Sequence, residues 1–121
     1  MPSCIIVDDH GDTLLGYAEF LASFGFAVRT AAEAEELRSH LADALPDAIV
    51  LDLQLPRVDG WQLTREIKED PRTRHIPIIV VSACVLPSER AAAKEAGADA
   101  FIAKPVDPLL ILEELQRWTG G

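Results

Sequence analysis

The alternation of short apolar runs with helical patterns constrains the fold of this chain more than any other feature. Five runs have the composition of β-strands: Cys4–Val7, Ala27–Thr30, Ala48–Leu51, Ile78–Val81 and Ala100–Ile102. The first, third and fourth are uninterrupted apolar runs, which is typical of parallel strands that are covered on both faces. The second run contains Arg29 and is expected to form an edge strand.

Residues with helical spacing fill the segments between these runs. The positions predicted to face the core are Leu14, Tyr17, Leu21 and Phe24 in the first helix, Ala34, Leu37, Leu41 and Ala44 in the second, and Leu63 and Ile67 in the third. The first helix is expected to have a left-handed C-cap at Gly25, the second to stop before Pro46, and the third to have its N-cap at Asp59. The fourth helix is expected from about Ser88 to Ala96, ending at Gly97, and the fifth from about Pro108 to Trp118. Five such units without a Pro/Gly-rich linker predict one α/β domain with a doubly wound parallel sheet, because crossovers are right-handed.

Four of the five predicted strands lead into polar or charged residues. Asp8 and Asp9 follow the first strand, Asp52 ends the third, Ser82 ends the fourth, and Lys104 follows the fifth. In a doubly wound sheet, ligands bind outside the carboxyl ends of the strands, where the strand order reverses. Two carboxylates about 5 Å apart repel each other by roughly 3 kcal/mol at an effective dielectric near 20. Three carboxylates at one edge therefore predict compensating cations, namely Lys104 and a hard divalent ion such as Mg²⁺.

Each of these features has a simpler interpretation when it is taken alone. Asp8-Asp9 after a strand is often only a turn or a helix N-cap, and an Asp at the end of a buried strand is common. Ser82 alone carries no functional signal, and Lys104-Pro105 is usually an exposed turn. The order of all of them along one five-unit sheet favours a functional site.

These residues resemble the receiver domains of two-component response regulators over essentially the whole chain. The matching stretches are Ile6–Asp9, Asp52–Gly60, Val81–Ala83, Glu95–Asp99 and Phe101–Pro105. The resemblance implies a single receiver domain at residues 1–121. It also implies a flavodoxin-like α/β fold, in which a five-stranded parallel sheet of order 2-1-3-4-5 is flanked by five helices.

The resemblance also implies a role for each matching residue. Asp52 is expected to be the phosphoacceptor, which takes a phosphoryl group from a histidine kinase or a histidine phosphotransfer protein. Mg²⁺ is expected to bind Asp9, Asp52 and the backbone carbonyl of Gln54 directly, and Asp8 mostly through water. Lys104 is expected to pair with the Asp52 carboxylate and then with a phosphoryl oxygen. The domain is then a phosphoacceptor in signalling, which catalyses only its own phosphorylation and dephosphorylation.

The expected switch consists of Ser82, which approaches the phosphoryl group, and Phe101, whose rotamer follows. Ser82 and Phe101 stand where Thr and Tyr are more frequent in the family. Gln54 and Cys84 lie at positions that tune the lifetime of the acyl phosphate, and the Lys104–Pro105 peptide is expected to be cis. The face formed by the fourth helix, the fifth strand and the fifth helix is expected to bind a downstream protein or a second copy.

Composition narrows the classes of partner and compartment. The net charge is −9 and the pI is about 4.6, which argues against direct binding of nucleic acid. No apolar run is long enough to span a membrane, and no leader segment precedes the first strand, so a cytoplasmic protein is expected. Cys4 and Cys84 lie in apolar contexts without metal or redox spacing and are interpreted as small core residues.

Three other functions compete with this interpretation. A flavin- or nucleotide-binding domain is disfavoured because the loop after the first strand, Asp8–Asp12, carries three carboxylates that would repel a phosphate. A phosphatase with an aspartyl nucleophile typically has a second acid two residues later, where this chain has Gln54. A pseudo-receiver, which binds proteins without being phosphorylated, stays open as the alternative function.

His10 and the predicted fifth helix need a separate interpretation. His10 could touch the rim of the site, but an exposed loop histidine is the favoured interpretation. The segment Leu109–Leu115 has too many apolar residues for one buried stripe, so part of this helix is expected to be exposed as a partner surface. The sequence leaves open whether the chain is a complete regulator or a piece of a larger one.

Overall fold

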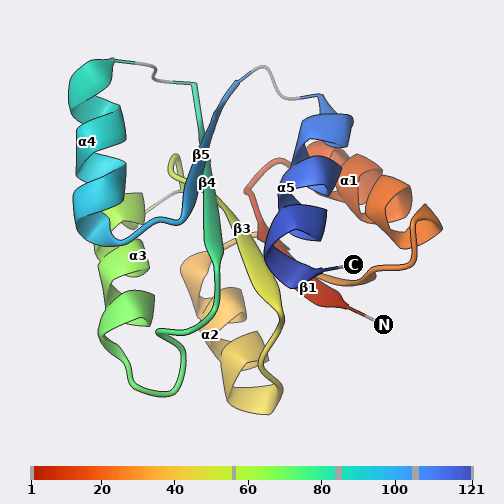
Figure 1. Cartoon of the computed structure of the whole chain (residues 1–121). Coiled ribbons are helices and arrows are strands. Elements are labelled where there is room, and N and C mark those ends of the chain that lie inside the picture. Colours follow the sequence, from red (N-terminus) through yellow and green to blue (C-terminus); the bar gives the residue numbers. More distant parts are fainter. Residues whose placement is uncertain (1, 56, 84–85, 105–106, 121) are drawn as a thin grey trace.

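Five parallel strands form the centre of the molecule in the computed structural model, which describes residues 2–55, 57–83, 86–104 and 107–120 (Figure 1). The strands are β1 (Ser3–Val7), β2 (Ala27–Ala31), β3 (Ala48–Asp52), β4 (Ile78–Ser82) and β5 (Ala100–Ala103). Their order in the sheet is β2-β1-β3-β4-β5, so the order reverses between β1 and β3. The predicted flavodoxin-like topology is therefore confirmed, including the place of β2 at an edge.

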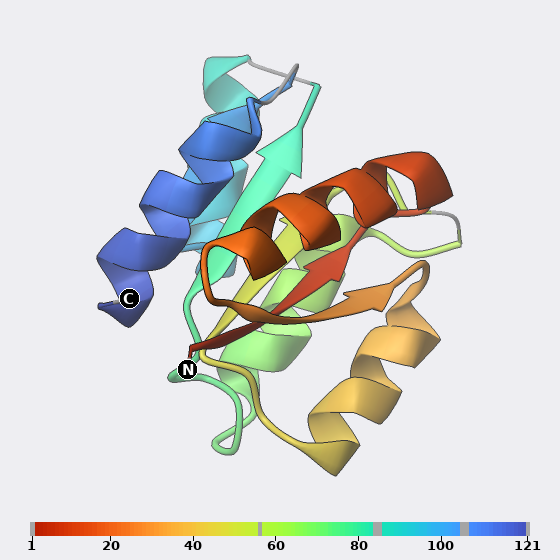
Figure 2. The same cartoon turned by 90° about the vertical axis from the view of Figure 1, so that its right-hand side faces the viewer.

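Five helices cover the two faces of the sheet. They are α1 (Gly11–Ser23), α2 (Ala34–Asp43), α3 (Gly60–Glu69), α4 (Pro87–Ala96) and α5 (Pro108–Thr119). Helices α1 and α5 lie on one face, whereas α2, α3 and α4 lie on the other (Figures 1 and 2). Both faces of the central strands are consequently buried, which is why these strands read as continuous apolar runs.

Alternate side chains of each central strand enter two separate cores. Ile5 and Val7 of β1 pack with α2 and α3, whereas Cys4 and Ile6 pack with α1 and α5. Cys4 is fully buried, as expected, and this burial raises the pKa of its thiol to about 12. The thiol is therefore an inert core group at neutral pH.

The helix ends follow the predicted capping signals, but two residues at helix ends do not face the core as predicted. The Asp59 side chain accepts a hydrogen bond from the Trp61 N–H, and Gly97 has the left-handed conformation that ends α4. Phe24 and Ala44 were expected to face the core but are exposed, with Phe24 at 53 %. The reason is that α1 ends at Ser23 and α2 at Asp43, so both residues lie past the last helical turn.

Helix α5 carries more apolar residues than it buries, as its sequence predicted. Ile111, Leu112 and Leu115 are buried, whereas Leu109 and Leu110 are 46 % and 47 % exposed. Among the described residues, no helix has the length and hydropathy needed to cross a membrane.

Candidate functional site

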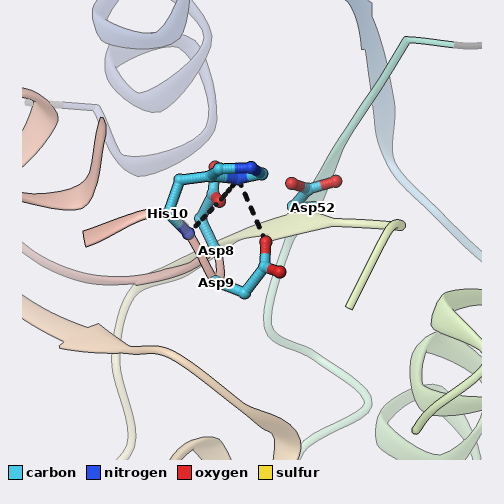
Figure 3. A group of neighbouring side chains, drawn as sticks. All are labelled: Asp8, Asp9, His10 and Asp52. Carbon is cyan, nitrogen blue, oxygen red and sulfur yellow. Dashed lines mark hydrogen bonds and ion pairs between the residues drawn. The ribbon is translucent and has the colours of Figure 1, made fainter. Parts of the chain in front are cut away.

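Four side chains from the carboxyl ends of β1 and β3 meet at the edge of the sheet. They are Asp8, Asp9, His10 and Asp52, and one potential ligand atom from each lies within 4.8 Å of those of the others (Figure 3). Strands β1 and β3 are neighbours in the sheet, so the topology alone places Asp8 and Asp9 beside Asp52. The predicted convergence of Asp8, Asp9 and Asp52 is therefore observed.

Backbone hydrogen bonds beyond the strands hold this edge in place. The N–H of Asp8 donates to Ala31 O at 3.0 Å, and the N–H of Leu53 donates to Val81 O at 3.1 Å. The N–H of Lys104 donates to Ser82 O at 2.8 Å. The positions of Asp8, Lys104 and the residue after Asp52 are thus set by the strand ladders rather than by loop conformation.

Asp52 is the most enclosed charged group of the site. Its side chain is 2 % exposed, and Lys104 Nζ donates a hydrogen bond to Asp52 Oδ2 at 2.8 Å. The N–H of Gln54 donates to Asp52 Oδ1 at 2.9 Å, so both carboxylate oxygens accept a hydrogen bond. Partial burial alone would lower the pKa of Lys104, but the hydrogen bond to Asp52 and the charges of Asp52 and Asp8 outweigh it and raise this pKa. Lys104 therefore stays positively charged beside Asp52 at neutral pH.

His10 closes the cluster on its solvent side, so the contact with the rim of the site, which was the less favoured interpretation, is present together with the expected exposure. Its side chain is 67 % exposed, yet Nδ1 lies 3.0 Å from Asp8 Oδ1 and 3.0 Å from Asp9 Oδ1. The hydrogen bond with Asp8, followed by the charges of Asp9 and Asp8, raises the pKa of His10. The only signal in the sequence is that His10 directly follows the two aspartates.

We expect the Asp8→Asn substitution to lower the pKa of His10 more than Asp9→Asn does, because Asp8 supplies both the hydrogen bond and a charge. NMR titration of the His10 ring, assigned with a His10→Asn variant, measures both changes. Since the folded-state pKa is raised, the contribution of His10 to stability is complete below its unfolded pKa of about 6.5 and is lost as the pH rises through the folded value. An unchanged pKa in Asp8→Asn would contradict this account.

Ser82 lies on β4, the strand next to that of Asp52, and Phe101 lies on β5, one strand further from Asp52. Ser82 is 3 % exposed and follows Val81, the β4 residue that pairs with Asp52. Phe101 is half-buried against the core formed with α2 and α3, and the Arg90 guanidinium lies 5.4 Å from the centre of its ring. This cation–π contact was not predicted, because Arg90 belongs to α4 and is distant in sequence.

The donor chemistry of the cluster fits a hard divalent cation. Three carboxylates converge, and Lys104 is the one fixed positive charge that contacts Asp52 among the described residues. At an effective dielectric near 20, two carboxylates about 5 Å apart repel by about 3 kcal/mol, so a second cation is favoured. Carboxylate oxygens are the ligands that Mg²⁺ prefers.

Comparison with known proteins assigns the family. A family model described as the response regulator receiver domain matches residues 4–116 of the chain. The chain belongs to the response regulator receiver domain family. The receiver domain is 33 % identical over 116 residues to the response regulator PleD of Caulobacter vibrioides, which is 95 % of this chain but 25 % of PleD. It is 30 % identical over 122 residues to the polar-differentiation response regulator DivK of Brucella ovis, covering 98 % of this chain and 96 % of DivK.

A solved structure agrees with the fold of this receiver domain. The receiver domain of sensor histidine kinase PA1611 from Pseudomonas aeruginosa has a TM-score of 0.87 and 30 % identity, covering 99 % of this chain and 98 % of that one. That structure has a magnesium ion coordinated in its active site cleft. Two expectations for this receiver domain, the cis Lys104–Pro105 peptide and the role of Cys84, fall on residues outside the described part of the chain.

Proposed function

We propose that Asp52 accepts a phosphoryl group from a phosphohistidine of a histidine kinase or a histidine phosphotransfer protein. The observation that carries this proposal is the buried Asp52 carboxylate, which is paired with Lys104 at the edge of a three-carboxylate cluster. We further propose that residues 1–121 act as one receiver domain in the cytoplasm, and that the acidic chain binds proteins rather than nucleic acid.

In the proposed reaction, an oxygen of Asp52 attacks phosphorus in line with the P–N bond of the donor. The new O–P bond forms as the P–N bond breaks, and the donor imidazole leaves with the electron pair and takes up a proton. Lys104 stays beside the acceptor and moves its hydrogen bond to a phosphoryl oxygen, while the Ser82 hydroxyl donates to another. Asp52 starts without the freedom to rotate, because both of its oxygens accept hydrogen bonds.

Mg²⁺ bound at Asp8, Asp9, Asp52 and the Gln54 carbonyl would supply positive charge to the phosphoryl oxygens. The fit of the donor set to this ion supports that role. Asp8 and Asp9 then act as the groups that select and hold the cation, and neither needs to exchange a proton during transfer.

The proposed output is a change of the face formed by α4, β5 and α5. Ser82 and Phe101 form the switch, because a Ser82 hydroxyl drawn to the phosphoryl group leaves room into which the Phe101 ring turns. The exposed Leu109 and Leu110 of α5 support a protein partner or a second copy on this face.

The test is intact-mass measurement after incubation with Mg²⁺ and a small acyl-phosphate or phosphoramidate donor. We expect one phosphoryl adduct on the parent protein and complete loss of the adduct in Asp52→Asn. The matched control is Asp12→Asn, which removes an exposed carboxylate from the first turn of α1 and should leave the adduct intact. Free phosphate is assayed in parallel, because rapid hydrolysis would hide the adduct.

Either of two results would contradict the proposal. An equal adduct on Asp52→Asn would place the phosphoryl group on another residue. Neither adduct nor released phosphate from the parent protein would favour the pseudo-receiver, which binds partners without being phosphorylated.

A further inference from the structure

The Phe101 ring contacts both an apolar core and a charged side chain of α4. The ring is half-buried and packs against the core that the sheet forms with α2 and α3. The Arg90 guanidinium carbon lies over this ring, 5.4 Å from its centre, which is within the range of a cation–π contact. Two different elements, β5 and α4, therefore determine where the ring lies.

Helix α4 directs Arg90 toward the ring. Arg90 lies three residues before Ala93, which is buried, so both residues lie on the same face of the helix. In the part of the chain that the structure describes, no carboxylate forms an ion pair with Arg90. The contact with Phe101 is consequently the interaction that places this exposed guanidinium.

Phe101 and Ser82 lie on the same face of the sheet. In the ladder between β4 and β5, Phe101 pairs with Val80 and Ala103 pairs with Ser82. Side chains alternate between the two faces along a strand, so Ser82 and Ala103 share the face of Val80 and Phe101. The β5 residue between the ring and Ser82 on this face is the small Ala103, which leaves the ring a short path toward the Ser82 hydroxyl.

We propose that Arg90 is a positioning residue, which holds the Phe101 ring in the position of the unphosphorylated receiver and thereby opposes the switch. This inference rests on the proposed switch at Ser82 and Phe101, and names the residue that sets the balance between its two states. A ring that turns toward Ser82 leaves the guanidinium. The loss of an exposed cation–π contact changes the ratio of the two ring positions by about threefold. Because coupling is reciprocal, a change that favours the turned ring favours the phosphorylated protein by the same factor.

The first measurement uses the full chain without a phosphodonor. NMR of protein with ¹³C-labelled phenylalanine, assigned with Phe101→Leu, should show nuclear Overhauser signals between the Phe101 ring and the Arg90 side chain. Arg90→Gln keeps a planar polar group but removes the charge. We expect this variant to strengthen the Overhauser signal between the ring and the Ser82 β-protons about threefold. Arg90→Lys keeps a cation and should restore most of the parent value.

A matched control removes the same charge from the same helix. Lys94 is an exposed residue of α4 and forms no ion pair among the described residues. Lys94→Gln should leave the Overhauser signals of the Phe101 ring as they are in the parent protein.

The second measurement is the rate of phosphorylation by a small acyl-phosphate donor with Mg²⁺. We expect Arg90→Gln to react about threefold faster than the parent protein, and Lys94→Gln to react at the parent rate. The loss of a positive charge would by itself slow the encounter with an anionic donor, so net charge does not explain a faster reaction. In the Phe101→Leu background, Arg90→Gln should have no effect, because the ring that Arg90 holds is absent.

Three results would overturn the inference. Arg90→Gln and Lys94→Gln could give equal signals between the Phe101 ring and Ser82, or equal rates of phosphorylation. The effect of Arg90→Gln could also persist in the Phe101→Leu background, and Arg90 would then act without the ring.

The measurement without a donor separates this inference from the proposed function. If Arg90→Gln changes the ring signals as expected but the parent protein accepts no phosphoryl group, the positioning role stands and the proposed function fails. If the parent protein is phosphorylated on Asp52, and Arg90→Gln matches it in ring signals and in rate, the function stands and this inference fails.

Discussion

The Gly60→Ala variant is expected to be less stable than the parent protein by about 3 kcal/mol, because one added methyl group has no room. A Cβ at Gly60 would lie 2.7 Å from Leu53 Cα and 2.8 Å from the Leu53 carbonyl oxygen. Both atoms belong to the backbone, so no side-chain rotation relieves the contact. Urea unfolding followed by circular dichroism measures the loss.

The same contact connects Gly60 with the functional site. Leu53 directly follows Asp52, and its N–H donates to Val81 O, so a shift of Leu53 displaces Asp52, the proposed phosphoacceptor. We expect the folded Gly60→Ala protein to take up phosphoryl about tenfold more slowly, since transfer depends on the placement of the attacking oxygen.

A second glycine provides the matched control for this prediction. Gly16 lies in α1 and is exposed, and an added Cβ would have nothing within 4 Å. Gly16→Ala should therefore stabilise the protein by about 0.5 kcal/mol through the lower entropy of the unfolded chain, and should not change phosphorylation. Equal stability of the two variants would contradict the steric explanation for Gly60.

The Lys104→Met variant is expected to lose about 2 kcal/mol of stability when no divalent cation is present. Methionine keeps most of the length of the side chain but leaves the Asp52 carboxylate, which is 2 % exposed, without its ion-pair partner. The loss is smaller than for a fully buried pair because the Lys104 side chain is 24 % exposed. Unfolding in urea with a chelator measures it, and added Mg²⁺ should restore part of the stability.

A double-mutant cycle tests the cause of this loss. In the Asp52→Asn background, residue 52 carries no charge that the loss of Lys104 could leave unpaired, so Lys104→Met should cost clearly less there, about 0.5 kcal/mol. The same cost in both backgrounds would mean that the Lys104 chain acts through packing, and the electrostatic explanation would be wrong.

The fold could be predicted from the sequence because its signals are local and agree with one another. Continuous apolar runs, helical spacing and caps such as Asp59 and Gly97 each depend on a few neighbouring residues. The two wrong positions, Phe24 and Ala44, lie at helix ends, where one turn more or less cannot be read from spacing.

The members of the candidate site were also largely predictable. Parallel strands bring their carboxyl ends to one edge, so Asp8, Asp9 and Asp52 had to meet once the strand order was known. The pairing of Lys104 with Asp52 was expected from the resemblance to receiver domains, and the structure has it at 2.8 Å.

Periodicity and chain order were enough to predict the α/β class, the edge at which the site forms and the carboxylates that form it. The directions of individual side chains became visible only in three dimensions: His10 turns toward Asp8 and Asp9, and Arg90 lies over the Phe101 ring. The close approach of Gly60 to the Leu53 backbone is a further contact of this kind. Such contacts depend on how helices and loops pack against the sheet. Differences of a few tenths of an ångström in packing distance cannot be predicted from the periodicity of the residues.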